Sequence, residues 1–125
     1  MLVLDAGALV AVDRGDRDVV VLLKRERMAG RSPVTCGGVV AQVWRGGHGR
    51  QVPLARLLAG VEVAPIDDSL GRRAGVLLDR SGQSDAIDAA VVCLAADGDD
   101  ILTSDPGDLL ALAQAADIHV EIIAV

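Results

Sequence analysis

Short apolar runs alternate with longer helical segments along this chain, and this alternation restricts the fold more than any other feature. The runs occupy residues 2–4, 34–36, 61–64, 101–105 and 119–125. Helical patterns or helix-start residues separate them, which gives the order β-α-α-β-α-α-β-α-α-β-α-β. Strands that are joined through helices make right-handed crossovers and lie parallel. We therefore predict an α/β fold around a central parallel sheet.

The predicted helices are marked by apolar periodicity, by capping residues or by proline in the first turn. They are expected at residues 6–12, 19–28, 38–45, 53–59, 68–80, 85–96 and 106–116. Ser84 is the predicted cap of the helix over 85–96, and His119 is placed in the last strand. No repeat, low-complexity segment or linker interrupts this pattern, so residues 1–125 are expected to form a single domain.

Composition decides what the core is made of. Apolar residues make up 51% of the chain, but Trp44 is the sole aromatic residue, so the core must consist of Val, Leu, Ile and Ala. The net charge of -6 argues against binding nucleic acid through bulk electrostatics, because phosphate neutralisation needs Lys and Arg. An enzyme that meets nucleic acid through a bound metal and a few arginines is compatible with this charge.

Nothing in the chain indicates secretion or a membrane. The apolar N-terminal stretch is broken by Asp5 and has no basic region before it, so it is not a signal peptide. No apolar stretch reaches the length of a transmembrane helix. Cys36 and Cys93 lie far apart in apolar settings, as buried thiols do in a reducing compartment. We expect a soluble cytoplasmic protein without a disulfide.

Polar residues follow two of the predicted strands. The run LVL leads into Asp5, and ILT leads into Ser104 and Asp105. In open α/β sheets, ligands bind beyond the carboxyl ends of the strands, where the strand order reverses. Asp5 and Asp105 are therefore expected to meet in space although 100 positions separate them.

Two pairs of aspartates occur at helical spacing. Asp85 and Asp88 share a face in the first turn of one helix, and Asp105 and Asp108 repeat the spacing in the next. Each pair alone is explained by capping and by the helix macrodipole. Asp5 has no such obvious explanation, and close carboxylates repel by about 4 kcal/mol near a protein surface. The cluster therefore favours a bound cation, and all-oxygen ligands suit Mg²⁺ or Mn²⁺.

The order of these motifs resembles that of PIN domains. The resemblance rests on Asp5 after the first strand, on the helix start SDAIDAAVV and on the strand end ILTSDPGDL. The length of the chain and the segment AQVWRGG are similar to those of VapC toxins of bacterial toxin–antitoxin pairs. The resemblance covers residues 2–124 and implies a PIN-like three-layer α/β/α domain with a central parallel sheet.

This resemblance assigns the acidic positions of the family to particular residues. Asp5 matches the first position, Asp88 the third and Asp105 the fourth, which implies that these three hold the metal and carry the catalysis. Asp85, one turn earlier, is a substitute or helper in metal binding, and the sequence leaves open whether Asp85 or Asp88 is the better ligand. The neighbours of Asp105 have further expected roles: substrate binding for Thr103 and Ser104, and support as an extra acid for Asp108.

The second acidic position departs from the family pattern. Where the family has Glu in a segment like AExxRG, this chain has Gln42 in AQVWRGG. Gln42 loses a full charge, so metal affinity and activity are expected to fall, and its catalytic role would be to orient a water or fill an outer shell. Arg45 is either a contact for the substrate phosphate or a solvated helix end. Trp44 is either a stacking surface for a base or a packing residue.

Three functions compete at this point. The resemblance implies a Mg²⁺- or Mn²⁺-dependent endoribonuclease, the toxin of a toxin–antitoxin pair, which acts on RNA, forms a homodimer and is blocked by a cognate antitoxin. The alternative is a catalytically impaired PIN domain that binds antitoxin or RNA, because Gln42 replaces the usual Glu. A phosphoacceptor domain of the receiver type fits less well, since Lys24 is the only lysine and Leu4 precedes Asp5.

Overall fold

Five parallel strands form the centre of the molecule. The computed structural model describes all residues from 1 to 125. The strands are β1 (Leu2–Leu4), β2 (Val34–Cys36), β3 (Glu62–Ala64), β4 (Asp100–Thr103) and β5 (Glu121–Ala124). They pair in the order β3-β2-β1-β4-β5, and every neighbouring pair is parallel. The prediction of an α/β fold with a central parallel sheet is confirmed.

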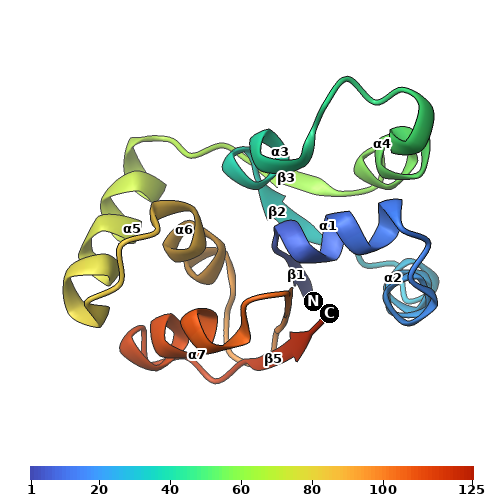
Figure 1. The fold of residues 1–125 in the computed structure, drawn as a ribbon. Coiled ribbons are helices and arrows are strands. Elements are labelled where there is room, and N and C mark those ends of the chain that lie inside the picture. The colour runs from blue at the N-terminus through green and yellow to red at the C-terminus, as the bar shows by residue number, and fades with distance from the viewer.

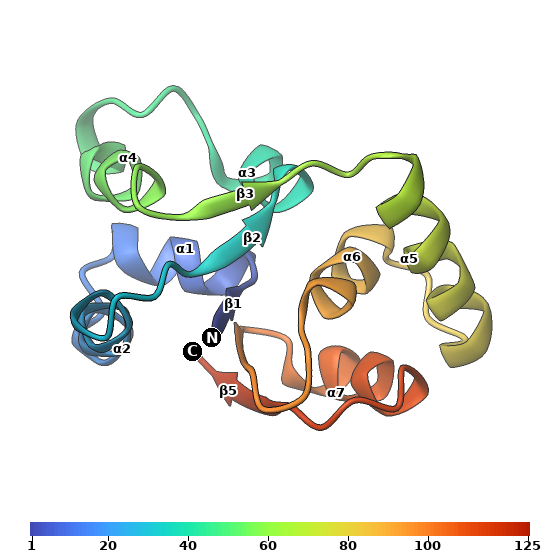
Figure 2. The ribbon, with the colours of Figure 1, turned by 180° about the vertical axis from the view of Figure 1, so that it is seen from behind.

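Helices cover both faces of this sheet. They are α1 (Ala6–Asp13), α2 (Arg17–Met28), α3 (Gly37–Val43), α4 (Val52–Leu58), α5 (Asp68–Ser81), α6 (Ala86–Leu94) and α7 (Pro106–Ala115), with a short 3₁₀ helix at Gly49–Gln51. Figures 1 and 2 show α1 to α4 on one side of the sheet and α5 to α7 on the other. The contacts follow the same division, since α1 packs against α2, α3 and α4, while α5, α6 and α7 pack against one another. This is the three-layer arrangement expected from the sequence.

The strand order reverses at the centre of the sheet. The chain adds β2 and β3 to one side of β1, and then crosses over to place β4 and β5 on the other side. As a result, β1 and β4 are neighbours, with Leu4 opposite Leu102. Their carboxyl ends lie side by side at the position where open α/β sheets bind ligands.

The core is aliphatic, as the composition requires. Among the largest fully buried side chains are Leu4, Leu9, Ile101 and Leu102. One cluster of 24 buried residues includes side chains of α1 on one side of the sheet and of α6 and α7 on the other. Full burial of a side chain of this size stabilises the folded state by roughly 1.5–3 kcal/mol. The buried strands β1 and β4 therefore give fixed positions to the residues that follow them.

The cap of α6 differs from the predicted one. Asp85, and not Ser84, caps this helix, because Asp85 Oδ1 accepts hydrogen bonds from the backbone N–H groups of Ile87 at 2.9 Å and Asp88 at 3.0 Å. Aspartate and serine are both good N-cap residues, so the choice depends on where the helical backbone begins. The helix begins one residue later than predicted.

Several other element boundaries also differ from the predicted ones. The third predicted helix ends at Val43, and α6 ends at Leu94. The last strand begins only at Glu121, so His119 precedes it. The backbone N–H of His119 donates to the side chain of Asp97 at 2.8 Å, which takes it out of the sheet ladder.

Both cysteines are free. Cys36 is buried as expected, but Cys93 is only half-buried, at the end of α6. None of the helices combines the length and the apolar character that crossing a membrane would require.

Candidate metal centre

Asp5 lies at the junction of the two central strands. Contrary to the expectation that it has no helix to cap, Asp5 caps the N-terminus of α1, where its Oδ1 accepts a 2.8 Å hydrogen bond from the backbone N–H of Ala6. Its own backbone N–H donates to the carbonyl of Leu102 at 3.0 Å. Only 5% of the residue is exposed. Asp5 is thus held firmly between α1 and β4.

Thr103, the last residue of β4, links Asp5 to Asp105. The Thr103 hydroxyl donates a 2.7 Å hydrogen bond to Asp5 Oδ2 and accepts one of 2.9 Å from the backbone N–H of Asp105. Thr103 is fully buried, so its hydroxyl positions the two acids instead of facing a substrate as we expected. Ser104 beside it is exposed, so its hydroxyl is accessible to a substrate. We call Asp5 and Thr103 the Asp5 junction.

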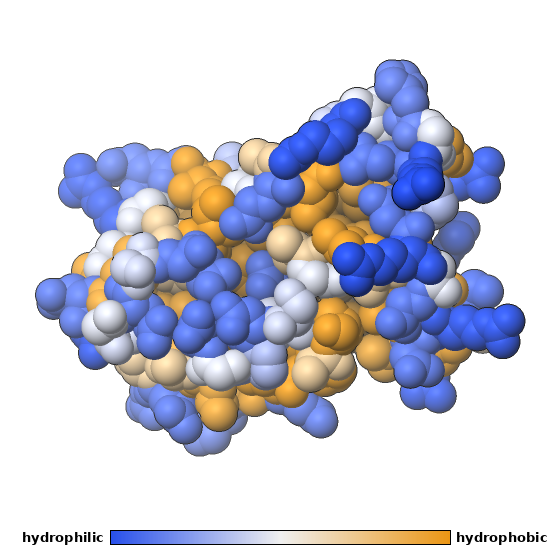
Figure 3. All heavy atoms as spheres, viewed as in Figure 1, coloured by the Kyte–Doolittle hydropathy of each residue, from blue (hydrophilic) through white to orange (hydrophobic).

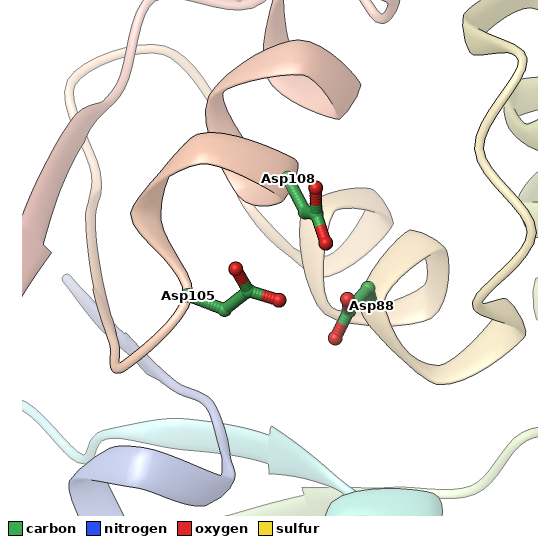
Figure 4. A group of neighbouring side chains, drawn as sticks. All are labelled: Asp88, Asp105 and Asp108. Atoms are coloured by element: carbon green, nitrogen blue, oxygen red, sulfur yellow. The ribbon is translucent and has the colours of Figure 1, made fainter.

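Three aspartates bring their carboxylates together beyond these strands. Asp88, in the first turn of α6, faces Asp105 and Asp108 at the start of α7 (Figure 4). One carboxylate oxygen of each lies within 4.8 Å of the others. Asp105 occupies the N-cap position of α7 but makes no capping bond with its side chain, so its carboxylate stays available. We call these three residues the Asp88 group, and their oxygens suit a hard divalent cation such as Mg²⁺ or Mn²⁺.

Burial and mutual repulsion change the acidity of the Asp88 group. Burial, together with the charges of Asp5, Asp85, Asp105 and Asp108, raises the pKa of Asp88 from 3.8 to about 7. The neighbouring Asp108 carboxyl, with which Asp105 can share a proton, raises the pKa of Asp105, and desolvation and the charges of Asp108, Asp5 and Asp85 add to this shift. A raised pKa means that the surroundings compensate the negative charge poorly. A cation among the three carboxylates would supply that compensation.

Asp85 has a different place from Asp88. It is exposed, and its Oδ1 is engaged in capping α6. Its charge contributes to the raised pKa of Asp88, but its carboxylate is not one of the three that converge. The geometry therefore favours Asp88 over Asp85 as a metal ligand, a choice that the sequence left open.

Asp5 is also outside the converging three. Its charge nevertheless acts on both Asp88 and Asp105, since it contributes to the raised pKa of each. Two hydrogen bonds use about half of the lone-pair positions of a carboxylate, which has about four. Asp5 keeps acceptor capacity toward a cation and holds a fixed orientation.

Gln42 and Arg45 lie at and just beyond the end of α3, which follows β2. Both residues are exposed. The Arg45 guanidinium donates to the carbonyls of Ala41, Gln42 and Trp44 at 2.6–3.3 Å, and so satisfies carbonyls at the end of the helix. Of the two roles considered for Arg45, this geometry favours the helix end over the phosphate contact.

The glycine-rich loop after α3 is fixed by Gln51, which the sequence pattern did not single out. Its side-chain oxygen accepts from the backbone N–H groups of Arg45 at 2.7 Å and Gly47 at 3.2 Å, while its amide donates to the Val43 carbonyl at 2.7 Å. The Trp44 ring packs against Gly47, and 37% of the tryptophan remains exposed. The hydrogen bonds of Gln51 therefore hold the two ends of the loop together beside the Trp44 ring.

Gly7 is a second residue that sequence reasoning missed. A Cβ at this position would lie 2.5–2.6 Å from the side chain and backbone N of Ser104. Glycine thus allows the first turn of α1 to touch the segment between β4 and α7, which carries Asp105. A single glycine inside an apolar helical pattern is the available signal, since it marks close packing or a functional constraint.

The strand order, the layers and the acids beyond β1 and β4 define a PIN-like α/β domain. Among solved structures, a chain in the crystal structure of VapBC2 from Rickettsia felis, bound to a DNA fragment from their promoter, has a similar fold with a TM-score of 0.68. The match covers 97% of this chain and 97% of that chain at 12% sequence identity. No protein-family model and no curated protein matches the sequence. The resemblance to VapC-like PIN domains is thus confirmed for the fold.

Proposed function

We propose that this protein is a Mg²⁺- or Mn²⁺-dependent endoribonuclease and the toxin of a toxin–antitoxin pair. The observation that carries the proposal is the Asp88 group, three carboxylates from two helices within 4.8 Å of one another. It lies beyond the carboxyl ends of the central strands, where the strand order reverses. Such a group is costly without a cation, as the raised pKa of Asp88 indicates.

Each residue has a distinct task in this proposal. Asp88, Asp105 and Asp108 would hold the cation, and Asp5 would face it from a fixed position. A bound divalent cation supplies an activated water and stabilises the attacking and leaving oxygens of a phosphodiester. The exposed Ser104 hydroxyl lies next to Asp105, where it can donate to a phosphate oxygen. Gln42, which carries no charge, would orient a water or fill the outer shell of the cation.

In the proposed site, the replacement of the usual Glu by Gln42 matters less for metal binding than the sequence pattern indicated. Asp108 belongs to the converging group, so three carboxylates are present without a contribution from Gln42. Mg²⁺ binds readily through few carboxylates because it retains several waters. Asp108 therefore changes from a supporting acid into a proposed ligand.

Partners follow from the fold neighbour. The structure of VapBC2 was determined with a DNA fragment from the promoter of its genes. By analogy with this complex, we propose a cognate antitoxin for this chain. Homodimer formation and action on RNA in the cytoplasm are proposed on the resemblance of its motifs to those of VapC toxins. The alternative function is a binding module for antitoxin or RNA without catalysis, which the absence of a carboxylate at Gln42 favours.

The test is RNA cleavage by metal-stripped protein with Mg²⁺ or Mn²⁺ added back. We expect the wild type to cut and Asp88→Asn to lose about 100-fold or more in rate, which corresponds to roughly 2.7 kcal/mol of barrier. Asp79→Asn is the matched control, because Asp79 is an exposed aspartate on α5 outside the acidic group. Gln42→Glu should cut faster than the wild type at low metal concentration.

Cleavage that persists after chelation, or that Asp88→Asn and Asp79→Asn affect equally, would reject the nuclease proposal. If neither the wild type nor Gln42→Glu cuts RNA with either metal, the binding module becomes the better description. In that case, metal should still raise the melting temperature of the wild type but not that of Asp88→Asn.

A further inference from the structure

Positive charge is concentrated in one stretch of this acidic chain. No Asp or Glu occurs between Glu26 and Glu62, whereas five arginines lie in the same stretch. The whole chain has a net charge of -6, so the stretch stands out against its surroundings. Figure 3 shows the most strongly hydrophilic side chains over the end of the molecule that α2 and α4 form. Segregated charge of this kind is an electrostatic footprint for an anion.

The structure gathers part of this charge around one cavity. The cavity has a volume of about 640 Å³ and lies between α2, the loop Gly30–Pro33 and the end of α4. No acidic residue is among those that line it. Four of its lining residues are cationic, namely Lys24, Arg27, Arg31 and Arg56. We call it the cationic pocket.

Most of the cations in the pocket have no partner. Arg31 is engaged by Glu26 through two hydrogen bonds of 2.9 and 3.0 Å. Lys24, Arg27 and Arg56 are exposed and form no ion pair. These three side chains come from two different helices.

Helix dipoles do not account for this excess of charge. Arg27 and Arg56 lie in the last turns of α2 and α4, where a cation compensates the negative end of a helix. Each helix end contributes only about half a negative charge, so the two together offset about one of the four cations. Glu26 offsets another, and about two positive charges remain.

We propose that the cationic pocket binds the phosphate group of a nucleotide, either a free nucleotide or one within an RNA strand. Arginine guanidinium groups recognise phosphate oxygens in a bidentate fashion. The apolar side chains of Val12, Leu23 and Leu57 provide a wall for a base or ribose. The cations surround one cavity and do not follow a long groove, which suits a compact phosphate group better than the spaced carboxylates of an acidic peptide.

The pocket is also remote from the Asp88 group, whose negative charge would oppose the binding of an anion. Pro33 and Gly60 line it, and they precede β2 and β3, so the pocket lies at the amino ends of the strands. The Asp88 group lies at the carboxyl ends, beyond β4. The two sites are therefore at opposite ends of the strands. At physiological ionic strength, charges are screened over about 8 Å, so the acidic group does not repel a phosphate in the pocket.

The test is calorimetric titration of the full-length protein at low ionic strength in the presence of a chelator, which keeps RNA uncut. The ligands are inorganic phosphate, adenosine, adenosine 5′-monophosphate and a short oligoribonucleotide. The variant Arg27→Gln/Arg56→Gln should bind the phosphate-bearing ligands about tenfold more weakly or worse. The control Arg14→Gln/Arg17→Gln removes the same charge outside the pocket and should bind like the wild type.

The ligand series separates the two sources of phosphate. Binding of the mononucleotide supports a free nucleotide, whereas binding of the oligoribonucleotide alone supports an RNA strand. Equal affinity of the pocket variant and the control, equal binding of adenosine, or stronger binding of poly-glutamate would overturn the proposal. Because no catalysis occurs in chelator, a failure of the nuclease proposal leaves this test intact.

Discussion

The Asp5 junction and the Asp88 group lie at the same edge of the sheet but are held in opposite ways. At the junction, each Asp5 oxygen has its own donor, from Ala6 and from Thr103. In the Asp88 group, the carboxylates mainly face one another, and the pKa of Asp88 is raised to about 7. Asp5 therefore contributes to the stability of the fold, whereas the ionised Asp88 is kept at a cost to stability. Residues whose charge opposes folding are candidates for function.

The strongest test of this comparison is Asp5→Asn. We expect a loss of about 2–4 kcal/mol in the free energy of unfolding, because the asparagine oxygen can accept from only one of the two donors and its NH₂ group would face the other in a buried site. Chemical denaturation of metal-free protein at pH 8 measures the change. If Asp5→Asn were as stable as the wild type, the Asp5 junction would not stabilise the fold, and its contrast with the Asp88 group would be wrong.

Thr103→Val tests the same junction from the other side. Valine keeps the shape but leaves Asp5 Oδ2 and the Asp105 N–H without their partner, which should cost about 1–3 kcal/mol. RNA cleavage should fall as well, since Asp105 loses its anchor. Thr103→Ser keeps the hydroxyl and should restore cleavage more fully than stability, because it still lacks the methyl group. Equal cleavage by the valine and serine variants would contradict a positioning role.

Asp88→Asn should act in the opposite direction from Asp5→Asn. The pKa of Asp88 in the folded state, about 7, lies above the ordinary value of 3.8. Below about pH 4 both states carry the proton, whereas between about pH 4 and 7 only the folded state does, so stability falls as the pH rises. Asparagine cannot lose a proton, and we expect it to be more stable than the wild type by about 1–2 kcal/mol at pH 8, after allowance for partial exposure.

The measurement is denaturant unfolding of both proteins from pH 4 to pH 8, with and without Mg²⁺. The gap between the two proteins should be small near pH 4, widen between about pH 4 and 7, and stay constant above pH 7. Mg²⁺ should stabilise the wild type at pH 8 and leave Asp88→Asn almost unchanged. A variant that is less stable than the wild type at pH 8 without metal would show that the Asp88 group is not under electrostatic strain.

The sequence was sufficient to predict which acids follow the central strands, because this depends on the topology of the sheet alone. Apolar runs that end in Asp5 and in Ser104–Asp105 were enough, because parallel strands bring their carboxyl ends to one edge. The prediction of the fold succeeded for a related reason, since the buried strands β1 and β4 contain short aliphatic runs, LVL and IL. The helix ends were less predictable, as the caps Asp85 and Ser84 show.

The relations between side chains on different elements were not predictable. Nothing local shows that the Thr103 hydroxyl joins Asp5 to Asp105, or that Asp108 converges with Asp88 while Asp85 does not. These relations depend on how α6 and α7 pack beside each other. The cationic pocket is of the same kind, since the stretch without acids is visible in the sequence but the cavity exists only after α2 and α4 come together.

Asp85 shares features of the Asp5 junction and of the Asp88 group. Its substitution is expected to give the smallest change in stability. It caps α6 through Oδ1, as a folding residue does, yet its charge helps to raise the pKa of Asp88. Asparagine caps a helix about as well as aspartate, so Asp85→Asn should change the free energy of unfolding by less than about 0.5 kcal/mol. The pKa of Asp88, followed by NMR titration of its carboxyl carbon, should fall, because one repelling charge is gone. A large loss of stability would place Asp85 with the Asp5 junction, whereas an unchanged pKa would separate it from the Asp88 group altogether.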